Sequence, residues 1–151
     1  MISGSGLLGE EQEKFYRSIK LGTWYLKEGL FMGNLISLVT GGCGFIGSHL
    51  VDRLLAEGHT VRVIDNFTTG RPQNLEHQKE NKNLGIYQMD IRKKEEIEPV
   101  FQGVDYVFHL AALADIVPSI QKPWEYYSSN VLGTYNVVEC AREAGIRKLV
   151  Y

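Results

Sequence analysis

Four glycines stand within seven residues of the stretch LVTGGCGFIGSHL at residues 38–50. Because glycine costs backbone entropy, such a cluster indicates a strained turn or a backbone that another group approaches closely. Gly41, Gly44 and Gly47 have the spacing G-x-x-G-x-x-G. If they join a strand to a helix, the free N–H groups and positive dipole end of that helix can hold a pyrophosphate. A turn kept only for packing gives the same pattern.

Each of these glycines has a separate predicted task. Gly41 permits the tight turn after the strand, and Gly44 leaves room for the phosphates. Gly47 allows the helix to pack closely on the strand. Phe45 and Ile46 lie between the second and third glycines and belong to the same predicted cofactor-binding turn.

An acidic residue ends the next predicted strand, HTVRVID at residues 59–65. The carboxylate of Asp65 can accept hydrogen bonds from the adenosine ribose hydroxyls of a dinucleotide. It would also repel a 2′-phosphate by roughly 1–4 kcal/mol at about 4 Å, which favours NAD over NADP. Arg71 in the following loop could soften this preference. The alternative is that Asp65 and Asn66 only begin a turn.

Two further strand ends carry candidate binding residues. Asp90 could accept from the adenine amino group while Ile91 packs on the ring, or Asp90 could cap the helix that follows. Leu110, Ala111 and Ala112 close the predicted strand VDYVFHLAA. Their small side chains would leave room for the ribose and pyrophosphate, and plain packing is the alternative.

From Leu35 onward strands and helices alternate, which implies βαβ units and a parallel sheet. The predicted strands are 34–39, 59–65, 84–90, 104–112 and 146–151, and the predicted helices are 45–58, 93–103 and 123–145. The first helix is read from its apolar residues Phe45, Ile46, Leu50, Leu54 and Leu55, and it stops at Gly58. Residues 66–74 read as a polar loop, 76–83 as a surface helix end or loop, and the region of Pro118 as a loop.

The first 33 residues differ from the rest of the chain. SGSG at positions 3–6 is typical of a flexible linker or a tag. Residues 10–30 could hold a short amphipathic helix with Phe15 and Ile19 on one side. We therefore expect an N-terminal extension at 1–33 and a dinucleotide-binding domain at 34–151.

Composition limits the possible partners. The net charge of −2 and a pI of about 6.1 do not provide the basic field that nucleic acid needs. The basic cluster at 92–94 is followed at once by Glu95 and Glu96. Cys43 and Cys140 form no metal-ligand pattern or disulfide framework, so we assign no metal and expect a reducing compartment. Without a membrane-length apolar run or a signal-peptide pattern, we expect a cytoplasmic protein with no membrane partner.

Four segments of the sequence together resemble the extended short-chain dehydrogenase/reductases. They are VTGGCGFIGSHLVDRLLAEGHTVRVIDNFTTG, MDIRK, VDYVFHLAA and NVLGTYNVVECAREAGIRKLVY. More narrowly, they resemble the NAD-dependent nucleotide-sugar epimerases and dehydratases, in particular UDP-glucose 4-epimerase-like members. The resemblance covers about residues 35–151. It implies an α/β fold, a Rossmann-type doubly wound parallel sheet, truncated here after strand five and preceded by the extension.

The resemblance also implies a cofactor, a substrate and site residues. The cofactor is NAD, and the reaction is hydride transfer to and from NAD at a carbon of a nucleotide sugar, as epimerase, dehydratase or decarboxylase. A non-catalytic NAD-binding module is the alternative. The implied contacts are Gly41, Gly44 and Gly47 at the pyrophosphate, Asp65, Asn66, Thr69 and Gly70 at the adenosine ribose, Asp90 and Ile91 at adenine, and Leu110, Ala111 and Ala112 on the nicotinamide side. Asn130 would support the cofactor loops, or is simply a polar residue on a helix face.

The chain departs from the family pattern in its catalytic residues. In the family, a serine or threonine and a Tyr-x-x-x-Lys pair follow strand five, but this chain stops at Tyr151. Tyr126 and Tyr127 are no substitute, because no lysine follows them at that spacing. Ala114 stands near the place where some epimerases have a lysine. We assign no catalytic residue and expect the chain to bind NAD without epimerising a sugar.

The resemblance also implies a homodimer. In the family, the helix predicted here at 123–145 contributes to the dimer interface. Its residues Tyr127, Val131, Tyr135 and Val138 either face a second copy or pack on the sheet.

Overall fold

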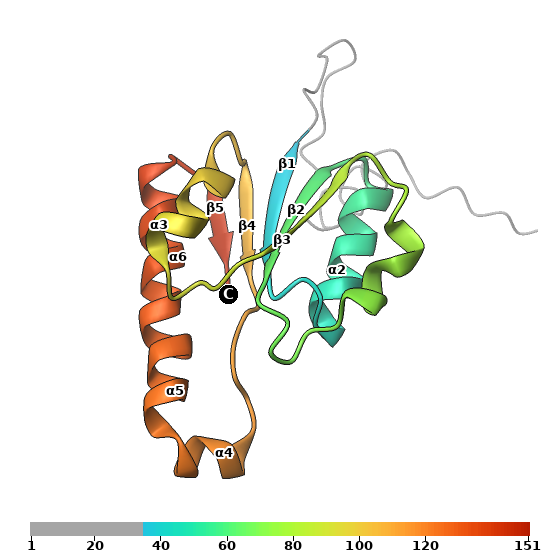
Figure 1. The fold of residues 1–151 in the computed structure, drawn as a ribbon. Coiled ribbons are helices and arrows are strands. Elements are labelled where there is room, and N and C mark those ends of the chain that lie inside the picture. Colours follow the sequence, from blue (N-terminus) through green and yellow to red (C-terminus); the bar gives the residue numbers. More distant parts are fainter. Residues whose placement is uncertain (1–34) are drawn as a thin grey trace, which may run out of the picture. The chain divides into compact units, whose positions relative to one another are not determined.

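Five parallel strands form one sheet in the order β3-β2-β1-β4-β5 in a computed structural model that describes residues 35–151 (Figure 1). This is the strand order of a Rossmann-type fold, so the predicted fold class is confirmed. The proposed linker and helix of residues 1–33 lie outside the described residues. The strands are β1 (Ile36–Thr40), β2 (Thr60–Asp65), β3 (Leu84–Gln88), β4 (Tyr106–His109) and β5 (Lys148–Val150).

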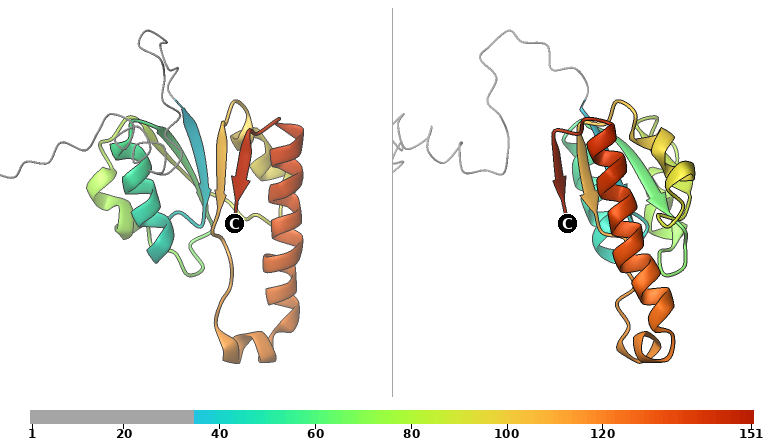
Figure 2. Two further views of the ribbon diagram at one scale, coloured as in Figure 1. Left: turned by 180° about the vertical axis from the view of Figure 1, so that it is seen from behind. Right: turned by 90° about the vertical axis from the view of Figure 1, so that its left-hand side faces the viewer.

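Helices cover both faces of the sheet, as the two views of Figure 2 show. Side chains alternate along β1, so Leu38 packs into one core cluster and Val39 into the other. In β2, Ile64 and Val63 divide in the same way. Because both faces are buried, these strands are almost continuously apolar. One face carries α2 (Phe45–Ala56) and the 3₁₀ helix η1 (Pro72–Gln78), and the other carries α3 (Lys94–Ile97), the 3₁₀ helix η2 (Glu98–Phe101) and α6 (Thr134–Glu143).

Two strands end earlier than the sequence predicts. β3 ends at Gln88, so Asp90 lies beyond it, and β4 ends at His109, so residues 110–112 follow it. In both cases the strand stops where its hydrogen-bonded neighbour ends: β3 stops at the end of β2, and β4 at the end of β1. The last bonds run from Met89 N to Asp65 O (3.1 Å) and from Leu110 N to Thr40 O (3.0 Å). The segments that leave the sheet here become walls of a pocket.

The predicted helices 93–103 and 123–145 are each divided. The first changes from α3 to η2 next to Pro99, which has no N–H to continue α-helical bonding. The second consists of α5 (Pro123–Tyr127), the π-helical turn η3 (Ser128–Gly133) and α6, which ends at Glu143. π-helical turns are rare and occur frequently at functional sites.

Two segments predicted as loops contain helices. The region of Pro118 forms α4 (Ile116–Gln121) at the far end of the helical layer (Figure 1). Within 66–74 the polar loop gives way at Pro72 to η1, whose Leu75 is fully buried against α2. The polar, loop-like composition of this segment therefore does not indicate the 3₁₀ helix or its buried residue Leu75.

Three of the five apolar residues that predict α2 pack on the sheet: Leu54 is buried, and Leu50 and Leu55 pack against the same core cluster. Phe45 and Ile46 are 79% and 70% exposed. In the first turn the buried residues are instead the small Gly47 and Ser48, and Val51 is buried with Leu54 further along the helix. Within residues 35–151, no helix has the length and apolar content needed to cross a bilayer.

Candidate functional site

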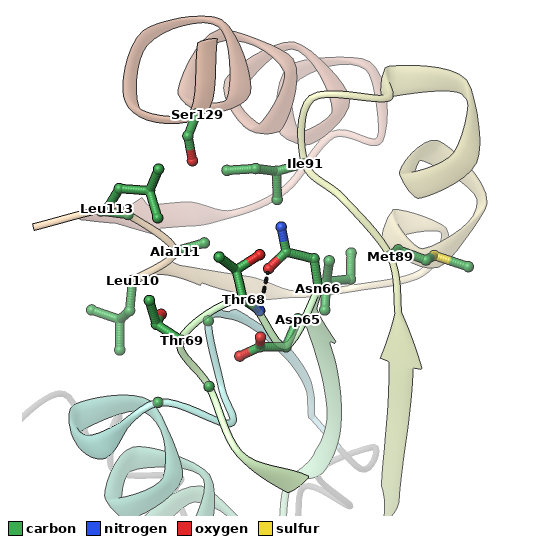
Figure 3. Close-up of a pocket in the computed structure, with 15 residues that line it drawn as sticks. Asp65, Asn66, Thr68, Thr69, Met89, Ile91, Leu110, Ala111, Leu113 and Ser129 are labelled. Carbon is green, nitrogen blue, oxygen red and sulfur yellow. Dashed lines mark hydrogen bonds between the residues drawn. The ribbon is translucent and has the colours of Figure 1, made fainter. Parts of the chain in front are cut away.

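A pocket lies at the carboxyl ends of β1, β2 and β4, where the strand order reverses (Figure 3). Such a crevice is where open α/β sheets bind ligands. Ten predicted residues line it: Gly41, Gly44, Asp65, Asn66, Thr69, Gly70, Ile91, Leu110, Ala111 and Ala112. Phe45, Ile46, Gly47, Asp90 and Asn130 were predicted but are not among the lining residues, whereas Ile64, Thr68, Met89, Leu113 and Ser129 line it without having been predicted.

The glycine turn packs directly against the segment that follows β4. Gly41 has φ +70°, and a Cβ placed on it would lie 2.7 Å from the backbone N of Ala111. A Cβ on Gly47 would collide with Gly41 O. Both contacts are closer than any side chain permits, so α2 and residue 111 close tightly around the turn.

A fourth glycine, Gly42, is also required here, although the G-x-x-G-x-x-G spacing does not include it. A Cβ on Gly42 would lie 2.7 Å from Cγ1 of Val63 in β2. Gly42 therefore allows the turn to lie on the sheet. Its position between two predicted loop glycines was the available signal.

The start of α2 leaves backbone donors available next to the pocket. Gly44 is the N-cap and provides no side-chain cap, and the first bond back to it runs from Ser48 N to Gly44 O at 3.0 Å. The N–H groups of Phe45, Ile46 and Gly47 therefore have no partner within the helix. Since they also carry the positive end of the helix dipole, they are suited to an anion.

Asp65 holds the glycine turn in place. One carboxylate oxygen accepts from Cys43 N (3.0 Å) and the other from Phe67 N (2.8 Å). The residue is only 7% exposed. A Cβ on Gly70 would lie 2.6 Å from the same carboxylate, so the loop also closes over it. The structure thus gives Asp65 a structural task in addition to the predicted ribose contact.

Asp90 does not cap the helix after β3, so that alternative is wrong. The N-cap of α3 is Lys93, which has no side-chain cap bond. Asp90 instead accepts from the backbone N and the Nε of Arg92, both at 2.9 Å, and from Asn66 Nδ2 at 3.3 Å. The hydrogen bonds from Arg92 lower the pKa of Asp90 from its ordinary 3.8 to about 2.

This lowered pKa predicts an acid-dependent loss of stability. The folded state binds the Asp90 proton less tightly than the unfolded state, so the stabilisation is complete above about pH 4. It is lost as the pH falls towards 2. We expect Asp90→Asn to remove up to about 2 kcal/mol of the difference in unfolding free energy between pH 6 and pH 2. Urea unfolding across this range measures it. Arg92→Ala should produce the same flattening, and an unchanged pH profile in both variants would contradict the assignment.

The far wall of the pocket comes from the π-helical turn. Figure 3 shows Ser129 and Ile91 across the pocket from Asn66 and Thr68. The side chain of Asn130 accepts from Leu113 N and donates to Leu113 O, both at 2.8 Å. This pair attaches the segment after β4 to the turn. Asn130 therefore positions a lining segment without lining the pocket itself.

Residues 37–151 match the model of the NAD dependent epimerase/dehydratase family. The chain belongs to this family. The resemblance read from the glycine turn and the four quoted segments is thereby confirmed.

The relatives of this chain within the epimerase/dehydratase family are named for different reactions. The chain is 43% identical over 122 residues to UDP-glucuronic acid decarboxylase 2 of Arabidopsis thaliana, covering 81% of this chain and 26% of that protein. The Thermus thermophilus UDP-glucose 4-epimerase solved with NAD is 39% identical with a TM-score of 0.70, covering 78% of this chain and 37% of that one. The Streptomyces venezuelae dTDP-glucose 4,6-dehydratase, also solved with NAD, is 35% identical with a TM-score of 0.73, covering 78% and 38%.

The chain thus spans about a quarter to two fifths of the length of these relatives. The matched part contains the glycine turn and, except for Ile36 of β1, all five strands. These findings support a nucleotide-sugar enzyme family that uses NAD, and they do not separate its reactions.

Proposed function

We propose that residues 35–151 bind NAD across the carboxyl ends of β1, β2 and β4. The observation that carries the proposal is the glycine-rich turn at the start of α2, beside the pocket, whose N–H groups at residues 45–47 have no partner within the helix. The pyrophosphate would lie against this turn, and the adenosine ribose against Asp65 and Gly70. Adenine would pack near Ile91, and the nicotinamide would extend towards Ala112.

NMR titration tests this placement. On addition of NAD, we expect the largest amide shifts at Phe45, Ile46 and Gly47, because their N–H groups would contact the phosphates directly. Amides on the amino side of the sheet, such as that of Asp105, should not move. Shifts confined to other surfaces would reject the proposed mode of binding.

For the complete protein we propose epimerisation of a nucleotide sugar, by hydride transfer to and from bound NAD at a sugar carbon. The similarity to the Thermus thermophilus 4-epimerase supports it. The second candidate is decarboxylation of a UDP-sugar acid, which the 43% identity to the Arabidopsis thaliana decarboxylase favours. Incubating the complete protein with UDP-glucose and with UDP-glucuronic acid distinguishes them by product.

We further propose that the 151-residue chain alone binds NAD without turnover. The family tyrosine that takes the sugar proton has no counterpart among the matched residues, since neither Tyr126 nor Tyr127 is followed by a lysine at the required spacing. General acid–base catalysis contributes typically about 10²–10⁴-fold. We expect no product above background from UDP-glucose and NAD in a coupled assay, and measurable epimerisation would contradict the prediction.

We also propose that the chain forms a homodimer through α5, η3 and α6. Exposed apolar residues spaced three or four apart form a stripe along these three helical segments: Trp124, Tyr127, Val131, Tyr135 and Val138. A contiguous exposed apolar surface of this kind is typical of an interaction site.

Light scattering tests the dimer. Tyr135 belongs to the stripe and is 61% exposed, so Tyr135→Lys should shift the mass towards the monomer at micromolar concentration. The charge-matched control Asn83→Lys lies on another surface and should leave the dimer intact. Wild-type protein that is monomeric at high concentration would contradict the proposal.

We place the protein in the cytoplasm. Cys43 and Cys140 are buried free thiols in different core clusters on opposite faces of the sheet, so they cannot pair with each other without unfolding. Burial raises the pKa of both thiols to about 11, which keeps them unreactive. Fractionation with reporters for each compartment tests this placement.

A further inference from the structure

A row of polar side chains connects the ends of β1 and β4 to the start of α6, next to residues that line the pocket. Thr40 Oγ1 lies 2.6 Å from His109 Nδ1, and His109 Nε2 lies 2.8 Å from Thr134 Oγ1. The Thr134 hydroxyl donates to the backbone O of Asn130 at 2.8 Å. Thr40 is fully buried and His109 is 7% exposed. A buried polar group costs free energy unless it is paired, and both ring nitrogens of His109 are paired here.

The donors fix one tautomer of the histidine. Thr134 uses its single proton on Asn130 O, so it must accept the proton of His109 Nε2. Nδ1 is then unprotonated and accepts from Thr40, whose oxygen accepts in turn from Ala111 N at 3.4 Å. Burial lowers the pKa of His109, which agrees with a neutral ring.

Thr40 and His109 are each adjacent in sequence to a wall of the pocket, and Thr134 is hydrogen-bonded to Asn130, which is adjacent to the third wall. Thr40 precedes Gly41, and His109 precedes Leu110. At the third wall, Asn130 follows the lining residue Ser129 and holds Leu113 through its amide. The row therefore connects the glycine turn, the segment after β4 and the π-helical turn.

We propose that His109 is a positioning residue that sets the spacing between the glycine turn and the segment 110–113, so that the cofactor pocket is formed before the dinucleotide binds. The proposal rests on the NAD binding proposed above. An apolar side chain at position 109 could fill the same volume, but it would supply neither the direction nor the length of the two hydrogen bonds. Preorganisation of this kind raises affinity because less ordering remains to be done on binding.

A matched pair at Thr134 tests the coupling with little risk to the fold. Thr134→Val keeps the volume and removes the hydroxyl, whereas Thr134→Ser keeps the hydroxyl. By calorimetry on the 151-residue chain, we expect Thr134→Val to weaken NAD binding about tenfold and Thr134→Ser by less than about threefold. His109→Leu should match or exceed Thr134→Val. His109→Gln, whose amide can still donate to Thr134, should recover part of the loss.

Two readouts separate positioning from mere stability. Val107→Ala in the same strand should lower the unfolding temperature at least as much as Thr134→Val, yet leave the NAD affinity of the folded protein unchanged. In the unliganded protein, ring-nitrogen NMR should show a protonated Nε2 and a bare Nδ1 on His109. The amide of Leu113 should exchange about tenfold faster in Thr134→Val than in wild type at 25 °C.

Two results would overturn the inference: wild-type NAD affinity in Thr134→Val and His109→Leu, or a proton on Nδ1 of His109. A wild-type chain that binds no NAD would reject the proposed function instead. The positioning role of His109 is then tested by the two NMR measurements on the unliganded protein. An unchanged exchange rate of the Leu113 amide in Thr134→Val would overturn that role.

Discussion

Replacing Gly41 by alanine is expected to weaken NAD binding strongly, whereas the same change at Gly58 should leave NAD binding intact. Both residues have positive φ, +70° and +84°. Alanine therefore meets backbone strain of about 1–2 kcal/mol at either position. Only at Gly41 does the new Cβ also collide, at 2.7 Å from Ala111 N, because a Cβ on Gly58 meets nothing within 4 Å. The difference between the two variants in NAD affinity therefore measures the effect of the close approach between Gly41 and Ala111.

The size of the effect follows from what must move. Relieving the collision requires the turn or the segment 110–113 to shift, which costs about 1–3 kcal/mol beyond the shared strain. The shift also displaces the donors at the start of α2 from the phosphates. We expect at least about 100-fold weaker binding for Gly41→Ala, since misplaced donors lose charge-assisted bonds. Urea unfolding and calorimetry on both variants give the two quantities, and equal NAD affinities would show that the turn is not part of the site.

Asp65→Ala should produce the second large loss. It leaves the N–H groups of Cys43 and Phe67 without their acceptor in a buried region. Leaving two buried donors unpaired costs about 2–5 kcal/mol. NAD affinity should fall at least about 100-fold, because the variant loses both the fixed turn and the ribose acceptor.

Asp105 is the matched control for Asp65. It too accepts a backbone N–H, that of Ile36 at 2.9 Å, but at the amino end of the sheet, away from the pocket. Asp105→Ala should destabilise the fold by about 1–3 kcal/mol and leave NAD affinity unchanged. If both variants lose affinity in proportion to their loss of stability, Asp65 has only its structural task.

The parts of the fold that the sequence predicts well are those set by strong local patterns. Glycine positions and apolar runs predict the glycine-rich strand-to-helix turn, the strand that ends at Asp65 and the end of α2 near Gly58. The predicted ends of β3 and β4 were wrong because each strand ends where its neighbour, β2 or β1, ends. No local sequence pattern carries that information.

The site could be predicted only in part, for a related reason. Residues that belong to a sequence motif, such as Gly41 and Asp65, have fixed spacing in the sequence. Residues that position others do not: His109 and Thr134 are 25 residues apart and meet only through the fold. Ser129 lines the pocket because a π-helical turn places it there, and helical periodicity does not reveal such a turn.

The most direct test of the account is calorimetric titration of the wild-type 151-residue chain with NAD and, in parallel, with NADP. We expect one NAD per chain, bound at least about tenfold more tightly than NADP, because the carboxylate of Asp65 would repel the 2′-phosphate. Equal affinity for the two dinucleotides would contradict the role of Asp65. No binding of NAD at millimolar concentration would contradict the central claim that the glycine turn is a pyrophosphate site.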